Sequence, residues 1–342
     1  MLKTFLLCAG LTALSACAGT PQSAEAPAWV RNVEAVYPRA AYIAQRGEGG
    51  VRREAELAAL NGISFYFESE VGAEESLHRS WTEQNGVTAG ESRTETNTLV
   101  RSQTRLVAVR YAEDPWFNPA AKMWETVAFI DRDEAWTLYE PEAVKVKGAL
   151  SALSSAAEAE NDAFLRALRF GAAAAYGEGP EYNAVRGFAQ VLNPAKARAV
   201  FAEADAVRSA MPERIYSARQ AAAIFIECTG DLDGIISNAM TAALGAQGFP
   251  VEQARKAASC VCLIRVDLGA QKMESGTFYT PALTGTVSGG AGAVFSFTAK
   301  APRQSAVNPE VGRRRAYTAL AAALGEAFAA ELNRKQASYR EE

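Results

Sequence analysis

The spacing of hydrophobic residues changes along the chain, and it predicts a long helix near the start. Between Gly50 and Leu77, apolar residues such as Ala55, Ala59 and Ile63 recur every three or four positions, with charged residues between them. This period places the apolar residues on one face of an amphipathic helix. The segment 76–98 is polar and charged, and it fits either a continuation of that helix or a connection.

Two segments with alternating, β-branched and aromatic residues follow. TRLVAVRY (104–111) and MWETVAFI (123–130) are separated by the turn-rich EDPWFNPAAK. Alternation with a period of two is typical of half-buried strands, and turn residues between two such runs favour a hairpin-like pair. We therefore predict an antiparallel pair of strands here.

The middle of the chain is rich in alanine and predicts helices. The acidic cluster 131–134 precedes a helical stretch that extends to Tyr176, with Pro141 as a candidate break. Acidic side chains stabilise the start of a helix, so we interpret this cluster as a cap and not as a metal site. A second helical segment covers 183–209 and breaks at Asn193-Pro194.

After Pro212 the pattern becomes strand, helix, strand, two further strands and a closing helix. The predicted ranges are 221–228, 232–246, 259–268, 278–288, 292–300 and 311–334. The first two strands are expected to be parallel, because a helical crossover joins them.

The predicted fold class is α+β, with two small α/β modules, each a long helix on an antiparallel sheet, joined by an alanine-rich helical segment. The expected division is a signal peptide (1–16), a tether (17–27), a first domain (28–140), a helical connector (141–212) and a second domain (213–335). A chain of this length with about half of its residues apolar has enough material for two hydrophobic cores.

The N-terminus has the layout of a secretory signal. Lys3 precedes an uncharged stretch that ends at Ala16, too short for the ~20 apolar residues of a membrane-spanning helix. Leu14-Ser15-Ala16-Cys17 resembles the bacterial lipobox, which implies that Cys17 is diacylated and becomes the first residue of the mature chain. The alternative is an ordinary signal cut near Ala16. The following segment 18–27 is small, polar and proline-bearing, as in a tether.

The net charge and the cysteine content argue against two classes of protein: those that bind nucleic acid and those held together by disulfides. The chain has 35 Lys+Arg and 39 Asp+Glu, and removal of Lys3 with the signal leaves 34 against 39, a net charge of −5. Such a balance does not favour nucleic acid as a partner. Beyond Cys17 the cysteines are Cys228, Cys260 and Cys262, an odd number, so no disulfide framework is predicted.

Few residues suggest chemistry. His78, the one histidine, lies in a polar region, and we interpret it as a surface residue. Cys260 and Cys262 are expected on one strand face as small core residues, since with Cys228 they fall short of four zinc ligands. Asp231, in the GDLDG sequence at a strand end, is interpreted as a helix N-cap, although ligands often bind at such places.

The glycine runs GEGG (47–50) and SGGAGA (288–293) lack the context of a phosphate loop. The first opens a helix with no strand predicted before it, and the second joins two strands, so both are interpreted as turns. Trp124 and Trp136 are expected in the core. Trp116, in a loop between prolines, is a candidate for contact with a partner or a membrane surface.

Pro27-Ala28-Trp29-Val30, followed by Tyr37, Tyr42, the GEGG turn and an alanine-bearing helix, resembles the twenty-kilodalton outer-membrane lipoprotein (Lpp-twenty) family. The resemblance covers Pro27 to about Pro141. The resemblance implies a fold in which an aromatic strand, a glycine turn and a long helix precede an antiparallel sheet. It also implies a non-enzymatic envelope lipoprotein that assembles with partners. In its predicted element order, the segment from Arg214 to Lys335 resembles periplasmic modules of secretion and flagellar accessory proteins, which implies binding to other proteins at an envelope.

The expected function is therefore a structural or protein-interaction role at the outer membrane, facing the periplasm or the cell surface. The membrane is contacted through the lipid on Cys17, and other envelope proteins are the expected partners. No catalytic residue, cofactor or metal is predicted. The alternative is a periplasmic ligand-binding lipoprotein that uses the GDLDG strand end.

Overall fold

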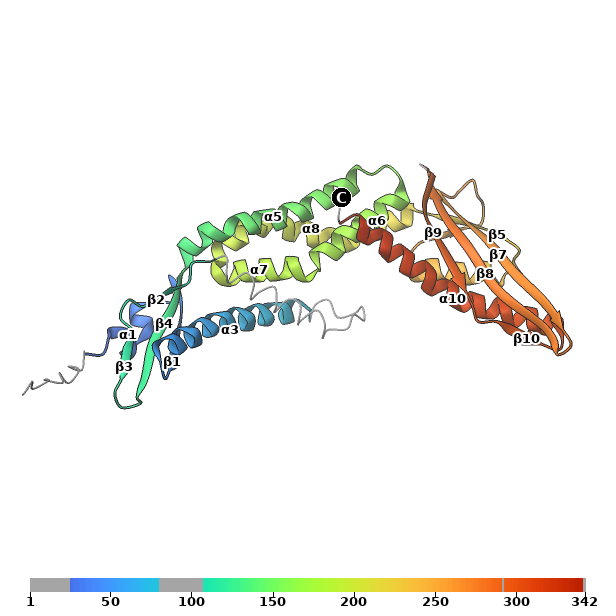
Figure 1. Ribbon diagram of the computed structural model, residues 1–342. Coiled ribbons are helices and arrows are strands. Elements are labelled where there is room, and N and C mark those ends of the chain that lie inside the picture. The colour runs from blue at the N-terminus through green and yellow to red at the C-terminus, as the bar shows by residue number, and fades with distance from the viewer. Residues whose placement is uncertain (1–24, 80–106, 291, 341–342) are drawn as a thin grey trace, which may run out of the picture. The chain divides into compact units, whose positions relative to one another are not determined.

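The computed structural model describes residues 25–79, 107–290 and 292–340, with the backbone alone for 73–79 (Figure 1). The fold is α+β, as predicted. The chain divides into two compact units: one contains the described residues up to Gly62 together with Arg110–Phe129, and the other contains the remainder.

The first unit is a small antiparallel sheet with short helices. Its elements are α1 (Ala28–Arg31), α2 (Val33–Val36), β1 (Tyr42–Gly49), the start of α3 (Arg52–Arg79), β2 (Arg110–Tyr111), β3 (Trp116–Asn118) and β4 (Met123–Asp131). The strand order is β1-β4-β2, and β2 and β3 both pair antiparallel with β4. A cluster of Trp29, Ala112 and Val127 forms the core between α1 and the sheet.

β1 lies where the residue pattern predicted no strand before GEGG, whereas the resemblance to the Lpp-twenty family implied an aromatic strand there. Gly47 and Gly49 belong to that strand. A Cβ atom on Gly47 would lie 2.1 Å from the Ala55 carbonyl oxygen and 2.2 Å from the Ala59 amide nitrogen. Glycine is therefore present because the backbone of α3 packs directly against β1, and not because the chain turns there.

The predicted antiparallel pair is confirmed in part. β4 matches the second predicted strand, whereas its partner β2 is only Arg110–Tyr111. Residues 107–109 are described and are not in a strand, and 104–106 lie outside the described residues. The predicted loop between them contains the additional strand β3.

The second unit contains four consecutive helices: α5 (Arg132–Ala159), α6 (Ala163–Gly177), α7 (Pro180–Leu192) and α8 (Pro194–Ala221). The Asp131 carboxylate accepts hydrogen bonds from the amides of Asp133 and Glu134, which confirms the acidic cap. The break at Asn193-Pro194 is also confirmed. A break at Pro141 is wrong, because α5 continues through it.

The later part of α3 packs against these helices. Phe67 stacks on Phe188 with ring centroids 4.0 Å apart, and Tyr139 lies 4.8 Å from the same ring. All three side chains are fully buried. The boundaries predicted near 140 and 212 lie inside α5 and α8.

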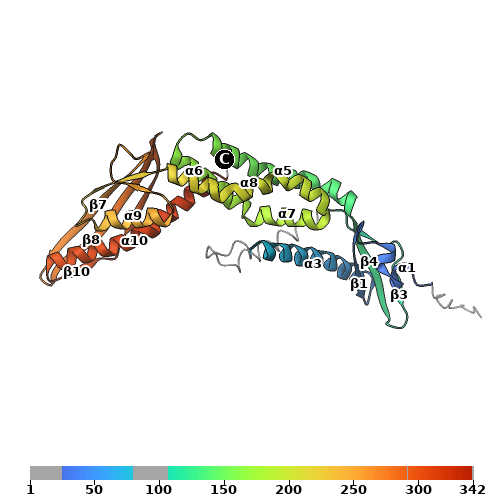
Figure 2. The same ribbon diagram turned by 180° about the vertical axis from the view of Figure 1, so that it is seen from behind.

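The C-terminal part of this unit is a six-stranded sheet covered by two helices (Figures 1 and 2). Its elements are β5 (Ile224–Thr229), α9 (Ile235–Ala246), β6 (Val251–Glu252), β7 (Cys260–Met273), β8 (Gly276–Gly289), β9 (Gly292–Lys300), β10 (Gln304–Ala306) and α10 (Pro309–Ser338). β5 is parallel to β7, which confirms the predicted crossover, and β8 is antiparallel to β7, β9 and β10.

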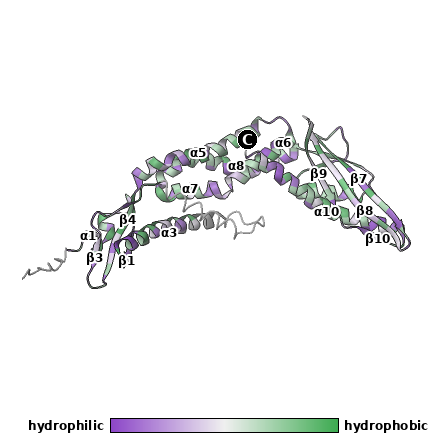
Figure 3. Cartoon of the chain, viewed as in Figure 1, coloured by the Kyte–Doolittle hydropathy of each residue, from purple (hydrophilic) through white to green (hydrophobic). Residues whose placement is uncertain are grey.

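Hydrophobic and hydrophilic residues alternate along these strands and around α10 (Figure 3). Sheet residues such as Leu283 and Val287 and helix residues such as Leu324 and Phe328 are buried where α10 covers the sheet. Among the described residues, none of the helices combines the length and hydrophobicity that crossing a membrane requires.

Candidate interaction surface

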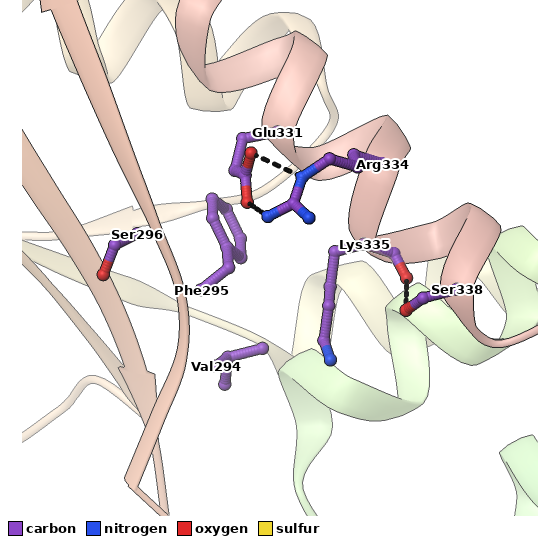
Figure 4. A pocket seen from close by; sticks show the side chains of 7 residues that line it. All are labelled: Val294, Phe295, Ser296, Glu331, Arg334, Lys335 and Ser338. Atoms are coloured by element: carbon purple, nitrogen blue, oxygen red, sulfur yellow. Dashed lines mark hydrogen bonds and ion pairs between the residues drawn. The ribbon is translucent and has the colours of Figure 1, made fainter.

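A hollow of about 440 Å³ lies between the edge strand β9 and the end of α10 (Figure 4). It is lined by Val294, Phe295, Ser296, Glu331, Arg334, Lys335 and Ser338. The Phe295 ring forms an apolar floor: it is nearly buried and lies 5.8 Å from the Phe328 ring and 6.1 Å from the Phe164 ring.

Charged side chains of α10 form the wall of the hollow. Glu331 and Arg334 make a two-pronged ion pair, with Arg334 Nε donating to Oε2 over 2.9 Å. The hydrogen bond from Arg334 lowers the pKa of Glu331, although partial burial opposes this, and the same contact raises the pKa of Arg334. The Lys335 ammonium lies 4.8 Å from the Tyr339 ring centroid. The ion pair of Glu331 and Arg334 therefore stays charged near neutral pH.

β9 borders the hollow with an open edge. In the described part of the chain, β8 is the strand partner of β9, and β9 is the last strand on this side of the sheet. Ser296 and Thr298 are exposed along β9, whereas Phe295 and Phe297 point into the core. An edge strand presents unpaired backbone amides and carbonyls, which can pair with an extended segment of another chain.

This surface was not predicted from the sequence. β9 and α10 were predicted as separate elements, but residues about forty positions apart line the hollow. Two signals for this surface were available in the sequence: the alternation of apolar and polar residues along β9, and the i,i+3 spacing of the oppositely charged Glu331 and Arg334. Neither signal shows that the end of α10 lies beside β9, because tertiary packing brings the two together.

Asp231 is not the N-cap of α9, contrary to the expectation from the sequence, because the helix begins at Ile235 and Gly234 is its N-cap. The Asp231 carboxylate nevertheless binds amides in the first turn of α9. It accepts hydrogen bonds from the amides of Leu232, Ile236 and Ser237, and from the Ser237 hydroxyl at 2.6 Å. Partial burial alone would raise the pKa of Asp231, but the bonds from Ser237 and the amides outweigh it, and the pKa is lowered. Both carboxylate oxygens are therefore occupied by the protein itself.

The three cysteines line the covered face of the sheet. Cys260 and Cys262 are buried, as predicted, and Cys228 is half-buried. Cys228 is in register with Ile264, and Cys260 with Ile224, so Cys228 and Cys260 lie at opposite ends of the paired segment of β5 and β7. Burial raises the pKa of Cys228 and Cys260 to about 11 and that of Cys262 to about 12. A neutral thiol is a poor nucleophile and a poor metal ligand.

The two glycine runs serve the fold. The amides of Gly50 and Val51 donate to the Glu54 carboxylate at 2.8 and 3.3 Å, so the chain's own side chain caps this helix start. Gly289 and Gly292 pair at the β8–β9 turn, which confirms the second predicted turn. The Asp162 carboxylate accepts a 2.6 Å hydrogen bond from the Gly290 amide.

Of the tryptophans, Trp136 is buried as predicted, whereas Trp124 is only half-buried. Trp116 belongs to strand β3 and not to a loop, and it is half-buried against the Trp29 cluster. Cys17 lies outside the described residues, as does the His78 side chain. Among the residues whose side chains are described, no three of His, Cys, Asp and Glu gather in a way that would hold a metal ion.

No protein-family model matches the chain, and no curated protein does. Two solved structures show distant similarity. A minor lipoprotein from Acinetobacter baumannii is 15% identical with a TM-score of 0.24, covering 33% of this chain and 95% of that one. A secreted protein from Helicobacter pylori is 10% identical with a TM-score of 0.32, covering 87% of this chain and 96% of that one. These values establish no family, and the resemblance to the Lpp-twenty family stays a prediction.

Proposed function

We propose that this protein is a lipid-anchored envelope protein that acts by binding another protein and not by catalysis. The observation that carries the proposal is the open edge of β9 beside the charged hollow at the end of α10. A free edge strand next to a pocket is suited to an extended peptide, because the backbone gives affinity and the pocket gives specificity.

The lipobox supports the anchoring part of the proposal. A diacylated Cys17 would hold the chain on a membrane, since two acyl chains give stable attachment. The outer membrane is the proposed location and envelope proteins are the proposed partners. Ligand binding at GDLDG is not favoured, because the Asp231 oxygens are occupied and Asp233 forms an exposed ion pair with Arg314 at 2.7 Å.

Substitution of Cys17 by Ser tests the anchor. We expect the variant to leave the membrane fraction, because it loses the acyl chains, while its thermal unfolding stays unchanged. Ala18→Ser, at the next position, is the matched control and should remain membrane-bound. A Cys17→Ser protein that still needs detergent for extraction would contradict lipid anchoring.

A photo-crosslinking amino acid at Ser296 tests the binding surface. Its side chain is exposed on β9, and Ser217, exposed on α8, is the control position. We expect a discrete covalent adduct in intact cells from position 296 alone, and its loss when Arg334→Glu reverses the charge on the wall of the hollow. Equal labelling from both positions, or none from position 296, would contradict a specific partner at β9.

A further inference from the structure

The hairpin of β3 and β4 in the first unit exposes a run of apolar residues at its turn. We call residues 115–124 (PWFNPAAKMW) the aromatic hairpin. Phe117 is 44% exposed, and Pro119, Ala120 and Ala121 at the turn are exposed as well. Trp116 and Trp124 are half-buried on the strands behind them. Such a patch on a surface marks a site of interaction.

The turn is held in one shape. The Asn118 side-chain oxygen accepts hydrogen bonds from the amides of Ala120 and Ala121 at 3.0 and 3.2 Å, and its amide group donates to Glu125 at 2.8 Å. Lys122 completes the turn in the left-handed region, with φ of 54°. The turn therefore does not have to lose further conformational entropy before its exposed apolar side chains make a contact.

The aromatic hairpin carries only positive charge. Lys122 is its only charged residue. The nearest carboxylate on β4, that of Glu125, is buried and paired with Arg46 of β1. Glu113 and Asp114 precede the aromatic hairpin, at the end of β3 away from the turn. An apolar tip with one lysine suits the boundary between acyl chains and anionic headgroups.

The aromatic hairpin lies close in space to the N-terminal segment, and this indicates what covers it. Trp29, four residues after the first described residue, lies in the cluster against which Trp116 packs. Cys17 is eight residues before Glu25, and eight residues span at most about 28 Å. A lipid on Cys17 would therefore keep the aromatic hairpin within reach of the membrane surface.

We propose that the aromatic hairpin inserts into the membrane interface, with Phe117 and the Pro119–Ala121 turn among the lipids and Lys122 at the headgroups. This rests on the proposed lipid anchor. It adds a second contact that sets the orientation of the first unit on the bilayer, since a flexible tether alone leaves the orientation free.

The test places an environment-sensitive fluorophore on a cysteine introduced at Ala120, in the lipidated full chain reconstituted into vesicles of phosphatidylethanolamine and phosphatidylglycerol. Ala58, exposed on α3 in the same unit, is the matched control position. With quencher groups on the acyl chains, we expect at least about threefold stronger quenching at position 120 than at position 58. Equal quenching at both positions would overturn the proposal.

The anchorless Cys17→Ser chain separates this proposal from the anchor. With the fluorophore at position 120, it should still partition onto the same vesicles at high lipid concentration, and Phe117→Ser should weaken that partitioning about tenfold, since one buried aromatic side chain is lost. Native mass spectrometry reports independently whether Cys17 carries acyl chains. A fluorophore at position 120 that is shielded from water in cells but unquenched by lipid would show a protein partner instead, and would overturn insertion.

Discussion

At the scale of single residues, Asp231 is the clearest case of a carboxylate that stabilises the fold. Because its pKa is lowered in the folded protein, its contribution is present above pH 4 and is lost as the pH falls through the folded pKa. We expect Asp231→Asn to lower the free energy of unfolding by about 1 to 2 kcal/mol at pH 7. Urea unfolding at pH 7 and pH 3 measures this, and the difference from the native chain should shrink at pH 3.

Asp233→Asn is the matched control for that change. Its carboxylate is exposed and pairs with an exposed arginine, so its loss should leave the unfolding free energy nearly unchanged. If both variants were equally destabilised, the hydrogen bonds to the start of α9 would not be the source of the effect.

The thiols provide a second prediction at this scale. With pKa values of about 11 and about 12, Cys260 and Cys262 are almost entirely neutral at pH 8 and are buried as well. We expect an alkylating agent to leave both unmodified in the folded chain and to label them after unfolding, as followed by mass spectrometry. Each Cys→Ala change should cost on the order of 1 kcal/mol. Rapid labelling of either thiol in the folded chain would contradict a packing role.

At the scale of elements, Pro141 shows where a local rule fails. Proline in a helix interior lacks the amide that would bond the carbonyl four residues earlier, yet α5 continues through it on an exposed face. We expect Pro141→Ala to raise the free energy of unfolding by about 1 to 3 kcal/mol in urea titrations. Pro194→Ala, at the first turn of α8, is the control and should bring no gain. A destabilised Pro141→Ala would mean that the packing of α5 requires the proline.

The elements that could be predicted from the sequence are those whose own residues carry the signal. β8, β9 and α10 show regular periods, and the structure places them within a few residues of the predicted ranges. β1 was implied by the family resemblance but could not be recognised from the residue pattern, because its glycines are required by the contact with α3 and not by their neighbours in the strand. β6 and β10 contain only two and three residues, too few for a period to be recognised.

The candidate site was less predictable than the fold. Both elements beside the hollow, β9 and α10, were predicted. The hollow itself forms only because tertiary packing brings Phe295 of β9 beside the ion pair of Glu331 and Arg334. The contact of Asp231 with the start of α9, by contrast, is a local interaction, and local spacing was enough to predict the contact although not the N-cap position, which Gly234 occupies.

At the scale of the whole molecule, α6 contributes to the core of the C-terminal sheet. Phe164 is fully buried, with its ring 5.0 Å from that of Phe249. The predicted second domain starts at residue 213 and omits this side chain. We expect a fragment from Arg214 to Glu342 to unfold cooperatively, but to be less stable by about 3 kcal/mol than one that starts at Glu160. Thermal unfolding of both fragments tests this, and a shorter fragment without a cooperative transition would show that the helices and the sheet share one core.

The pairing of β1 with β4 has a consequence for how the chain folds. Arg46 and Glu125, which form an ion pair across these strands, are 79 residues apart, and the first unit is made from two separate stretches of chain. The long loop must close before this sheet can form, whereas β7, β8 and β9 meet through short turns. When the chain emerges N-terminus first, β1 has no strand partner until β4 follows, but both emerge before any strand of the C-terminal sheet. The first unit can therefore pair its strands while the C-terminal sheet is still being synthesised.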